Sequence, residues 1–194
     1  MARPREFDQD EAVEKAMHAF WAHGYEATSL DDLCDAMGIG RSSLYHSFGS
    51  KRELLFAALD KYDEVNVKPY IQRALDRPGG VRAAIGALFE IAIQRTIDNG
   101  DRRGCFLGNC AAELASDDPE ARKRVAAGLA RIETRIYRRL VAAQENGEIG
   151  ADKDVRALAR FVTSSLQGLR IFGKAQANRA ALKDIAKTAL ACLD

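Results

Sequence analysis

The segment between residues 41 and 52 concentrates side chains that can bind DNA. It carries a guanidinium, two hydroxyls, a phenol and an imidazole, on Arg41, Ser42, Ser43, Tyr45 and His46. Such groups hydrogen-bond to base edges and to phosphate oxygens. The segment holds no acidic residue, whereas the whole chain, with 29 Lys+Arg and 28 Asp+Glu, has a net charge of only +1. A phosphate-facing surface needs this local separation of charge rather than a high isoelectric point.

Two short helices joined by a glycine turn would present these side chains. The first, over residues 29–37, has its apolar residues at the i, i+3, i+4, i+7 spacing of an amphipathic helix, namely Leu30, Leu33, Cys34 and Met37. Gly38 and Gly40 follow, and glycine tolerates the positive φ that a sharp turn requires. The second helix, over residues 41–48, buries Leu44 and Phe48 and turns its polar side chains outward. This pattern is typical of a helix-turn-helix whose second helix recognises DNA.

The rest of the sequence predicts helices almost throughout. Ser50 and Glu53 form a capping box that opens a helix reaching about residue 67. Pro69 should bend or restart the chain, because its ring does not fit a helix interior. Further helices are expected over residues 81–97, 105–115, 119–146, 152–176 and 178–193. We therefore expect an all-α protein with a helix-turn-helix DNA-binding domain at residues 1–50 and a helical regulatory and dimerisation domain at residues 51–194.

The helix-turn-helix segment resembles the N-terminal domain of the TetR/AcrR family of transcriptional regulators. The resemblance runs without a gap from Ala16 to Leu55, and it includes G-Y-E-A-T-S before the motif and L-Y-H-S-F-G-S-K at its end. It implies a DNA-binding transcriptional regulator, expected to be a repressor, that binds a palindromic operator as a homodimer; whether it represses or activates does not follow from the sequence. We expect Arg41 and Ser43 to contact base edges, and Ser42 is included among the predicted DNA-binding residues. The residues expected to contact phosphates are Thr28, Tyr45, His46 and Lys51.

Two helices near the C-terminus are richer in apolar and small residues than a surface helix should be. Their stripes consist of Ala157, Leu158, Phe161, Val162, Ser165, Leu166 and Leu169, and of Leu182, Ile185, Ala186, Ala189 and Leu190. Such stripes can pack within one chain. In the resembled family, however, this pair of helices forms the interface of a homodimer, and a two-fold dimer places its recognition helices about one DNA turn apart.

The four cysteines raise the question of thiol chemistry. With no export signal, structural disulfides are not expected, and the spacing of Cys105 and Cys110 is not that of a zinc site. Cys105 follows Arg102 and Arg103 at the start of a predicted helix, and both features favour the reactive thiolate. Cys105 is therefore a candidate redox sensor. The alternative is an inert buried thiol, as most unpaired cysteines are.

The segment G-C-F-L followed by A-A-E-L is similar to the sensor segment of TetR-family repressors that respond to electrophiles and reactive chlorine species. In those proteins a lysine on the penultimate helix can bond to the sulfur, and Lys174 is the matching position here. Asn109 and Cys110 depart from that pattern; Cys110 could act as a resolving thiol or simply pack. The other possibility is a small apolar effector in a pocket lined by the middle helices, with Cys105 incidental.

Other classes of function have little support in the sequence. The only histidines, His18, His23 and His46, fall in the N-terminal part, and no nucleophile–base pair, phosphate loop or metal-ligand cluster is evident. We therefore expect neither an enzyme nor a bound metal or cofactor. No apolar leader or membrane-length run is present, so a cytoplasmic location is expected. A helical adaptor that binds proteins rather than DNA is the alternative function.

Overall fold

The computed structural model describes residues 7–194, so the first six residues of the predicted DNA-binding domain lie outside the description. Over the described part of the chain the fold is entirely helical and contains no strand, as the sequence predicts. Its α-helices are α1 (Gln9–His23), α2 (Leu30–Met37), α3 (Arg41–Phe48), α4 (Lys51–Tyr62), α5 (Lys68–Leu75), α6 (Gly80–Ile97), α7 (Phe106–Leu114), α8 (Pro119–Glu145), α9 (Val155–Ala175) and α10 (Arg179–Leu190).

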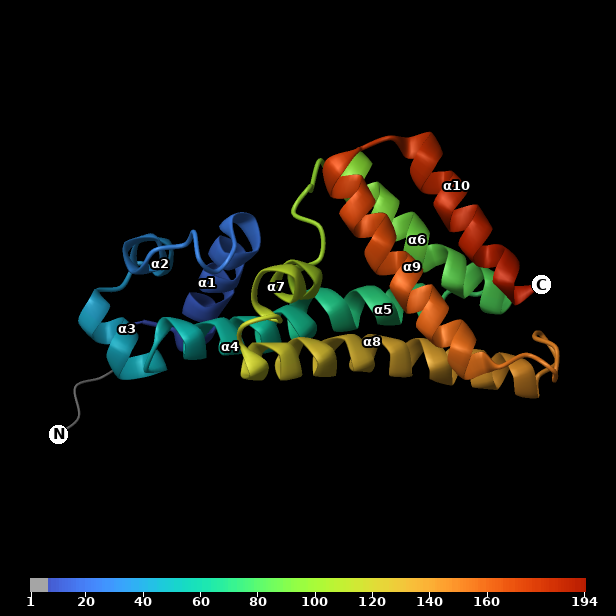
Figure 1. Cartoon of the computed structure of the whole chain (residues 1–194), viewed down its shortest axis with the longest axis horizontal. Coiled ribbons are helices and arrows are strands. Elements are labelled where there is room, and N and C mark those ends of the chain that lie inside the picture. The colour runs from blue at the N-terminus through green and yellow to red at the C-terminus, as the bar shows by residue number, and fades with distance from the viewer. Residues whose placement is uncertain (1–6) are drawn as a thin grey trace.

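The molecule is elongated, with a small head of α1, α2 and α3 at one end and a larger helical body at the other (Figure 1). Helix α4 runs from the head into the body and packs on α1, α3, α7 and α8. In the body α5 packs on α6, α8 packs on α7 and α9, and α10 packs on α6 and α9. The apolar interior is continuous from head to body.

The link between α4 and α5 is a π-helical turn, Asp63–Val67. Pro69 occupies the first turn of α5, where its missing N–H is tolerated. A proline at this place cannot complete the hydrogen bond to the preceding turn, and a widened turn relieves the clash of its ring. The prediction that Pro69 restarts the chain is confirmed, and the helix expected to reach residue 67 keeps regular α geometry only to Tyr62.

Much of the apolar stripe predicted for a dimer interface packs inside the chain. The residues buried there are Val162, Leu166 and Leu169 of α9 and Leu182, Ala186 and Ala189 of α10. The reason is that α9 and α10 pack on each other and on α6. A second apolar row of α9 faces outward instead, with Phe161 47% exposed and Ile171 62% exposed. This row lies along the helix at intervals of three and four residues and continues through Ala157, Ser164, Gly168 and Ala175.

Candidate DNA-binding surface and buried cysteine site

Local sequence signals build the helix-turn-helix. Ser29 caps α2 in a capping box with Asp32: its hydroxyl accepts from the Asp32 amide at 3.1 Å, and the Asp32 carboxylate accepts from the Ser29 amide at 2.8 Å. Gly38 ends α2 with φ of 70°, a left-handed conformation that suits glycine. Leu44 is fully buried and fixes α3 against the head. The turn between the helices is therefore specified residue by residue.

The polar side chains of α3 form a solvent-exposed face. The predicted DNA-contact residues on it are all exposed: Arg41, Ser42, Ser43, Tyr45 and His46. Tyr45 is 49% exposed, an unusual degree for an aromatic side chain in a protein of this kind. This face has the chemistry that DNA recognition requires.

An ion pair between the two helices of the motif was not anticipated from the sequence. The Arg41 guanidinium donates two hydrogen bonds to the Asp31 carboxylate of α2, with Nε–Oδ1 2.8 Å and Nη2–Oδ2 2.7 Å. The hydrogen bonds from Arg41 hold the pKa of Asp31 below its ordinary value. Arg41 is thus oriented by a carboxylate before any DNA phosphate or base is present.

Two predicted phosphate contacts have neighbours of their own in this structure. The Thr28 side chain is 1% exposed, and its hydroxyl donates to the carbonyl of Gly24 at 2.5 Å. A direct phosphate contact by that hydroxyl is not available in this conformation, because the hydroxyl fixes the turn between α1 and α2 instead. Lys51 lies with its ammonium 4.4 Å from the centre of the Tyr25 ring and is partly exposed.

Polar contacts tie the head and α4 to α7 and its flanking segments. Glu113 of α7 accepts hydrogen bonds from the backbone amides of Tyr25 and Glu26, at 3.0 and 2.8 Å. Arg52 of α4 makes a two-fold hydrogen bond to Asp118, the cap of α8, at 2.8 and 2.7 Å. The guanidinium of Arg103 lies 3.8 Å from the centre of the Trp21 ring of α1. Any movement of the segment between residues 103 and 118 therefore bears directly on the head.

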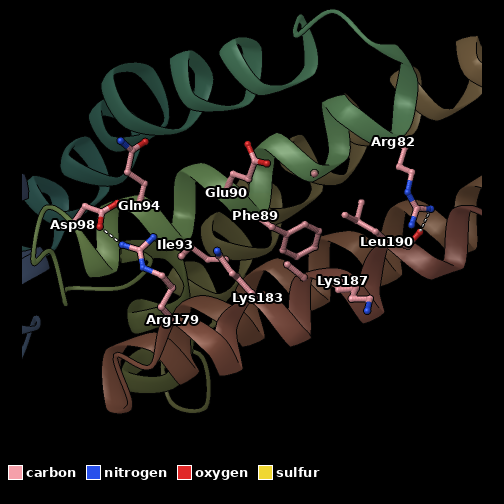
Figure 2. A pocket seen from close by; sticks show the side chains of 12 residues that line it. Arg82, Phe89, Glu90, Ile93, Gln94, Asp98, Arg179, Lys183, Lys187 and Leu190 are labelled. Carbon is pink, nitrogen blue, oxygen red and sulfur yellow. Dashed lines mark hydrogen bonds and ion pairs between the residues drawn. The ribbon is translucent and has the colours of Figure 1, made fainter.

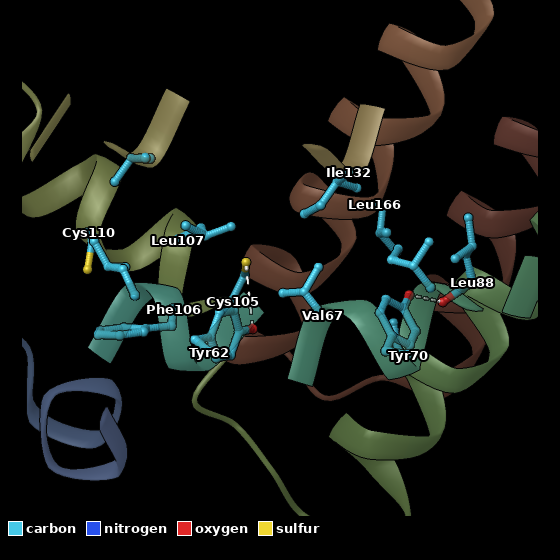
Figure 3. Close-up of a cluster of buried hydrophobic side chains, with 14 of the residues drawn as sticks. Tyr62, Val67, Tyr70, Leu88, Cys105, Phe106, Leu107, Cys110, Ile132 and Leu166 are labelled. Atoms are coloured by element: carbon cyan, nitrogen blue, oxygen red, sulfur yellow. Dashed lines mark hydrogen bonds between the residues drawn. The ribbon is translucent and has the colours of Figure 1, made fainter. Parts of the chain in front are cut away.

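Cys105 lies at the N-terminal end of α7, in the interior where head and body meet (Figure 3). Its side chain is 3% exposed. The hydroxyl of Tyr62, the last residue of α4, lies 3.9 Å from the sulfur and donates to it. Tyr62 packs edge-on against Trp21 of α1 at 5.0 Å and against Phe106 at 5.6 Å between ring centres. Cys105 is thus two contacts away from the DNA-binding head.

The guanidinium that lies near this cysteine belongs to Arg170 of α9. Arg170 is 6% exposed and donates a long hydrogen bond of 3.5 Å to the Tyr62 hydroxyl. Burial raises the pKa of Tyr62 above its ordinary value, and it raises the pKa of Tyr70, another neighbour of Arg170, to about 12. Both phenols therefore stay protonated at neutral pH and cannot neutralise the guanidinium.

The environment expected for Cys105 differs from this one. Arg103 turns away to the Asp101 carboxylate, at 2.9 Å, and Arg102 is exposed. The ammonium of Lys174 donates to the Asn109 side chain at 3.4 Å and makes no bond to the sulfur. Proximity in sequence is misleading here, because the loop before α7 directs both arginines outward while α9 delivers its own arginine from across the core.

Cys110 is also buried, and burial raises the pKa of its thiol to about 12. Figure 3 shows its sulfur separated from that of Cys105, with Phe106 and Leu107 between them. A disulfide needs its two sulfur atoms in direct contact. A resolving role for Cys110 would therefore require α7 to rearrange.

A groove of about 530 Å³ lies between α6 and α10 (Figure 2). Its floor is apolar, with Phe89, Ile93 and Leu190, and Lys183 and Lys187 stand on the α10 side. The region among the middle helices, where an effector pocket was expected, is filled by packed side chains such as Tyr70, Leu88 and Leu166 (Figure 3). The groove, which has room for a small molecule, thus lies at the outer edge of the body rather than among the middle helices.

Comparison with known proteins agrees with this architecture. The family described as bacterial regulatory proteins, tetR family, matches residues 12–58, and the tetracyclin repressor-like C-terminal domain matches residues 76–189. The chain is 34% identical over 195 residues to the uncharacterised HTH-type transcriptional regulator YezE of Bacillus subtilis, with 100% of each chain covered. It is 33% identical over 188 residues to the HTH-type transcriptional repressor ComR of Escherichia coli, covering 97% of this chain and 90% of that protein.

Among solved structures, one that resembles this chain is a cysteine mutant of the TetR family transcriptional regulator CifR, complexed with 26-bp double-strand operator DNA. The two align over 100% of both chains with a TM-score of 0.86 and 30% sequence identity. These relatives are transcriptional regulators and not enzymes. Between residues 7 and 194, no helix combines the length and the apolar character needed to cross a membrane.

Proposed function

The chain belongs to the TetR family of DNA-binding transcriptional regulators, and from this premise we propose that it is a repressor that binds a palindromic operator as a homodimer. The observation that carries the proposal is the exposed, acid-free face of α3, held in register by a fully specified turn. The operator-bound CifR structure supports the same use of the fold. A protein-binding adaptor without DNA, the alternative function, does not agree with membership of this family.

In the proposed complex α3 enters the major groove of the operator, in the bacterial cytoplasm. Arg41 and Ser43 contact base edges, Ser42 lies beside them, and Tyr45 and His46 contact phosphates together with Lys51 at the start of α4. Arg41 must leave Asp31 to do so. The DNA-binding domain is assigned to residues 1–50 and the regulatory body to residues 51–194, so Lys51 contacts DNA from the first residue of the body.

The dimer is proposed to form through the outward row of α9 together with α10. Phe161, Ile171 and Phe172 are 47%, 62% and 38% exposed, which is costly for a helix that remains in water. The small residues between them, Ser164 and Gly168, let a second helix approach closely. Light scattering at micromolar protein should give the mass of a dimer, and Ile171→Asp should give a monomer; a wild-type monomer would contradict this part of the proposal.

Release of the operator is proposed to follow covalent modification of Cys105, as in the electrophile-sensing and reactive-chlorine-sensing repressors of the family. The support is positional: Cys105 touches Tyr62, Tyr62 touches Trp21 of the head, and α7 holds the head through Glu113. Atoms added to this sulfur have no free space in so tightly packed a core, so the side chains around it must shift. The groove between α6 and α10 is the corresponding site for a small-molecule effector, should the response prove independent of the cysteine.

DNA binding is tested with a palindromic duplex selected by the protein from a random pool. In fluorescence anisotropy, Arg41→Ala and Tyr45→Ala should weaken binding at least tenfold, and Lys51→Ala should lower the slope of log affinity against log salt by about one. Lys123→Ala removes an exposed charge from α8 and is the matched control that should bind like wild type. Wild-type affinity in both α3 variants would overturn the assignment of the recognition helix.

A further inference from the structure

The surroundings of Cys105 contain hydrogen-bond donors and the buried positive charge of Arg170. The Asp101 carboxylate lines the same small cavity as Arg170 but pairs with Arg103 instead. Among residues 7–194 no acidic side chain forms an ion pair with Arg170, although its side chain is almost fully buried. Burial opposes the charge on Arg170, while the fields of Tyr62, Cys105 and Tyr70 leave its pKa above the ordinary value. Arg170 therefore stays charged, and a buried charge without a counter-ion is unfavourable.

A second polar side chain of α9, Gln167, lacks a hydrogen-bond partner within residues 7–194, at the place where α9 faces α7. Both amide atoms of Gln167 are buried and have no hydrogen-bond partner among the described residues. The amide approaches α7 at Gly108: a Cβ placed on Gly108 would lie 3.5 Å from Gln167 Oε1 and 3.6 Å from Cys105 Cβ. Buried amides in native proteins are nearly always paired, so an orphaned one calls for an explanation.

We propose that Arg170 and Gln167, with the Tyr62 hydroxyl, form a receiving site for an anionic oxidised sulfur on Cys105, and that this occupant is the cysteine sulfenate. The inference rests on the proposed function, since it makes Cys105 the modified residue. Each of the three groups can donate a hydrogen bond to a sulfenate oxygen, and Arg170 supplies the opposite charge. One occupant thus accounts for the unbalanced guanidinium and for the orphaned amide.

The chemistry requires an oxidant of the hydroperoxide class. The Cys105 sulfur attacks one oxygen of the peroxide, the O–O bond breaks, and the sulfur loses two electrons that the peroxide oxygens gain. With hydrogen peroxide the departing hydroxide takes the thiol proton and leaves as water, so the products are one sulfenic acid and one water. Loss of the sulfenic proton to solvent gives the sulfenate. Cys110 lies apart from this sulfur and does not condense with it directly.

Arg170 and Gln167 act here as positioning residues, and the test must separate that role from a structural one. The charged or titratable groups around Cys105 are Tyr62 of α4, Tyr70 of α5, Arg95 of α6, Asp101 in the loop before α7, Cys110 and Glu113 of α7 and Arg170 of α9. Asp101 pairs with Arg103 at 2.9 Å, and Glu113 accepts from the amides of Tyr25 and Glu26. The Arg95 guanidinium lies 5.2 Å from the centre of the Tyr70 ring, whereas Arg170 donates to Tyr62, whose hydroxyl donates to the cysteine sulfur. Arg170 is therefore the residue to change.

The experiment treats the reduced full-length protein with hydrogen peroxide, traps sulfenic acid with dimedone and measures labelling of the Cys105 peptide by mass spectrometry. Arg170→Met should lower the labelling rate at pH 7 about tenfold, because the positive charge that receives the sulfenate is gone. Arg170→Lys should recover most of the rate because it restores the charge. Gln167→Leu should lower the lifetime of the label-competent species severalfold.

The proposal is overturned if Arg170→Met, shown to be folded by circular dichroism, is labelled at the wild-type rate, or if Arg170→Lys is labelled no faster than Arg170→Met. It is equally overturned if wild-type Cys105 takes no label while Cys34 or Cys192 does. Because labelling is measured without DNA, its outcome is independent of operator release. A protein that forms the Arg170-dependent sulfenate yet stays on its operator would contradict the proposed function and leave this inference standing.

Discussion

Replacement of Arg170 by methionine should stabilise the reduced protein, although it removes a charged side chain and its contacts. The guanidinium is 6% exposed, its hydrogen bond to Tyr62 is 3.5 Å long, and the centre of the Tyr70 ring is 5.1 Å away. An unpaired buried charge costs several kcal/mol. A desolvated cation–π contact and a hydrogen bond from a charged donor each recover about 2 kcal/mol. Methionine replaces the apolar stem of the arginine, adapts to irregular space and needs no counter-ion.

When the cation–π contact and the hydrogen bond are set against the cost of the buried charge, Arg170→Met should raise the free energy of unfolding by about 1–3 kcal/mol. Each kcal/mol corresponds to a rise of about 2–4 °C in Tm for a chain of this size. Thermal unfolding followed by circular dichroism at pH 7, with a reductant present, measures it. The matched control is Arg156→Met on the same helix, where the guanidinium pairs with Glu133 at 3.2 Å and its side chain is 42% exposed. That change should cost less than about 1 kcal/mol. A loss of more than about 1 kcal/mol in Arg170→Met would refute the reasoning, because the guanidinium would then be a net stabiliser.

Three further changes test other contacts. Asp31→Asn removes the carboxylate that holds Arg41. Operator affinity at low salt, measured by anisotropy, should rise roughly two- to fivefold, as expected for release of one exposed ion pair. A fall in affinity would show that DNA binding requires the Arg41 position that Asp31 fixes. Glu113→Ala removes the acceptor of two backbone amides in the turn after α1. Hydrogen exchange of those amides should speed up, and the free energy of unfolding should fall by about 1–2 kcal/mol. Unchanged exchange would contradict the link between α7 and the head. Gly128→Ala places a methyl group 2.7 Å from a Leu107 side-chain carbon in the core, so it should lower the free energy of unfolding by about 1–3 kcal/mol. A denaturation curve identical to that of the wild type would show that α7 shifts freely to make room.

The helix-turn-helix was predictable because its determinants are local. The apolar spacing of α2, the cap at Ser29 and the glycine turn at Gly38 all act within a few residues, and each indicates the same structure. The bounds of α3, residues 41–48, follow from the same signals. The helices of the body were likewise predictable to within a few residues, because helical periodicity persists over their whole length.

The cysteine site was not predictable in the same way. Arg170 lies 65 positions after Cys105 in the chain, and Tyr62 lies 43 positions before Cys105. Only the packing of α4, α7 and α9 brings the three residues together. Sequence proximity suggested Arg103 instead, which pairs with Asp101 two residues away. The Arg41–Asp31 pair was missed for a related reason, since it depends on the angle between α2 and α3 rather than on either helix alone.

The feature that was hardest to predict from the sequence was which apolar residues belong to the core and which to the proposed dimer surface. Apolar residues at helical spacing indicate that one face of a helix is covered. They do not indicate whether another helix of the same chain or a second protomer covers it. In α9 the buried row and the outward row alternate along the same helix, so Val162 packs inside while its neighbour Phe161 remains 47% exposed. Tertiary packing decides between them.

Operator release by a thiol reagent tests the central claim most directly. Wild-type protein and Cys105→Ser, each bound to the same fluorescent palindromic duplex, are titrated with hydrogen peroxide, hypochlorite or N-ethylmaleimide while anisotropy is followed. The account predicts that the wild type leaves the duplex and that the serine variant stays bound, with both binding equally before the reagent is added. Equal release of the two proteins, or release of neither, would contradict a regulator controlled through Cys105.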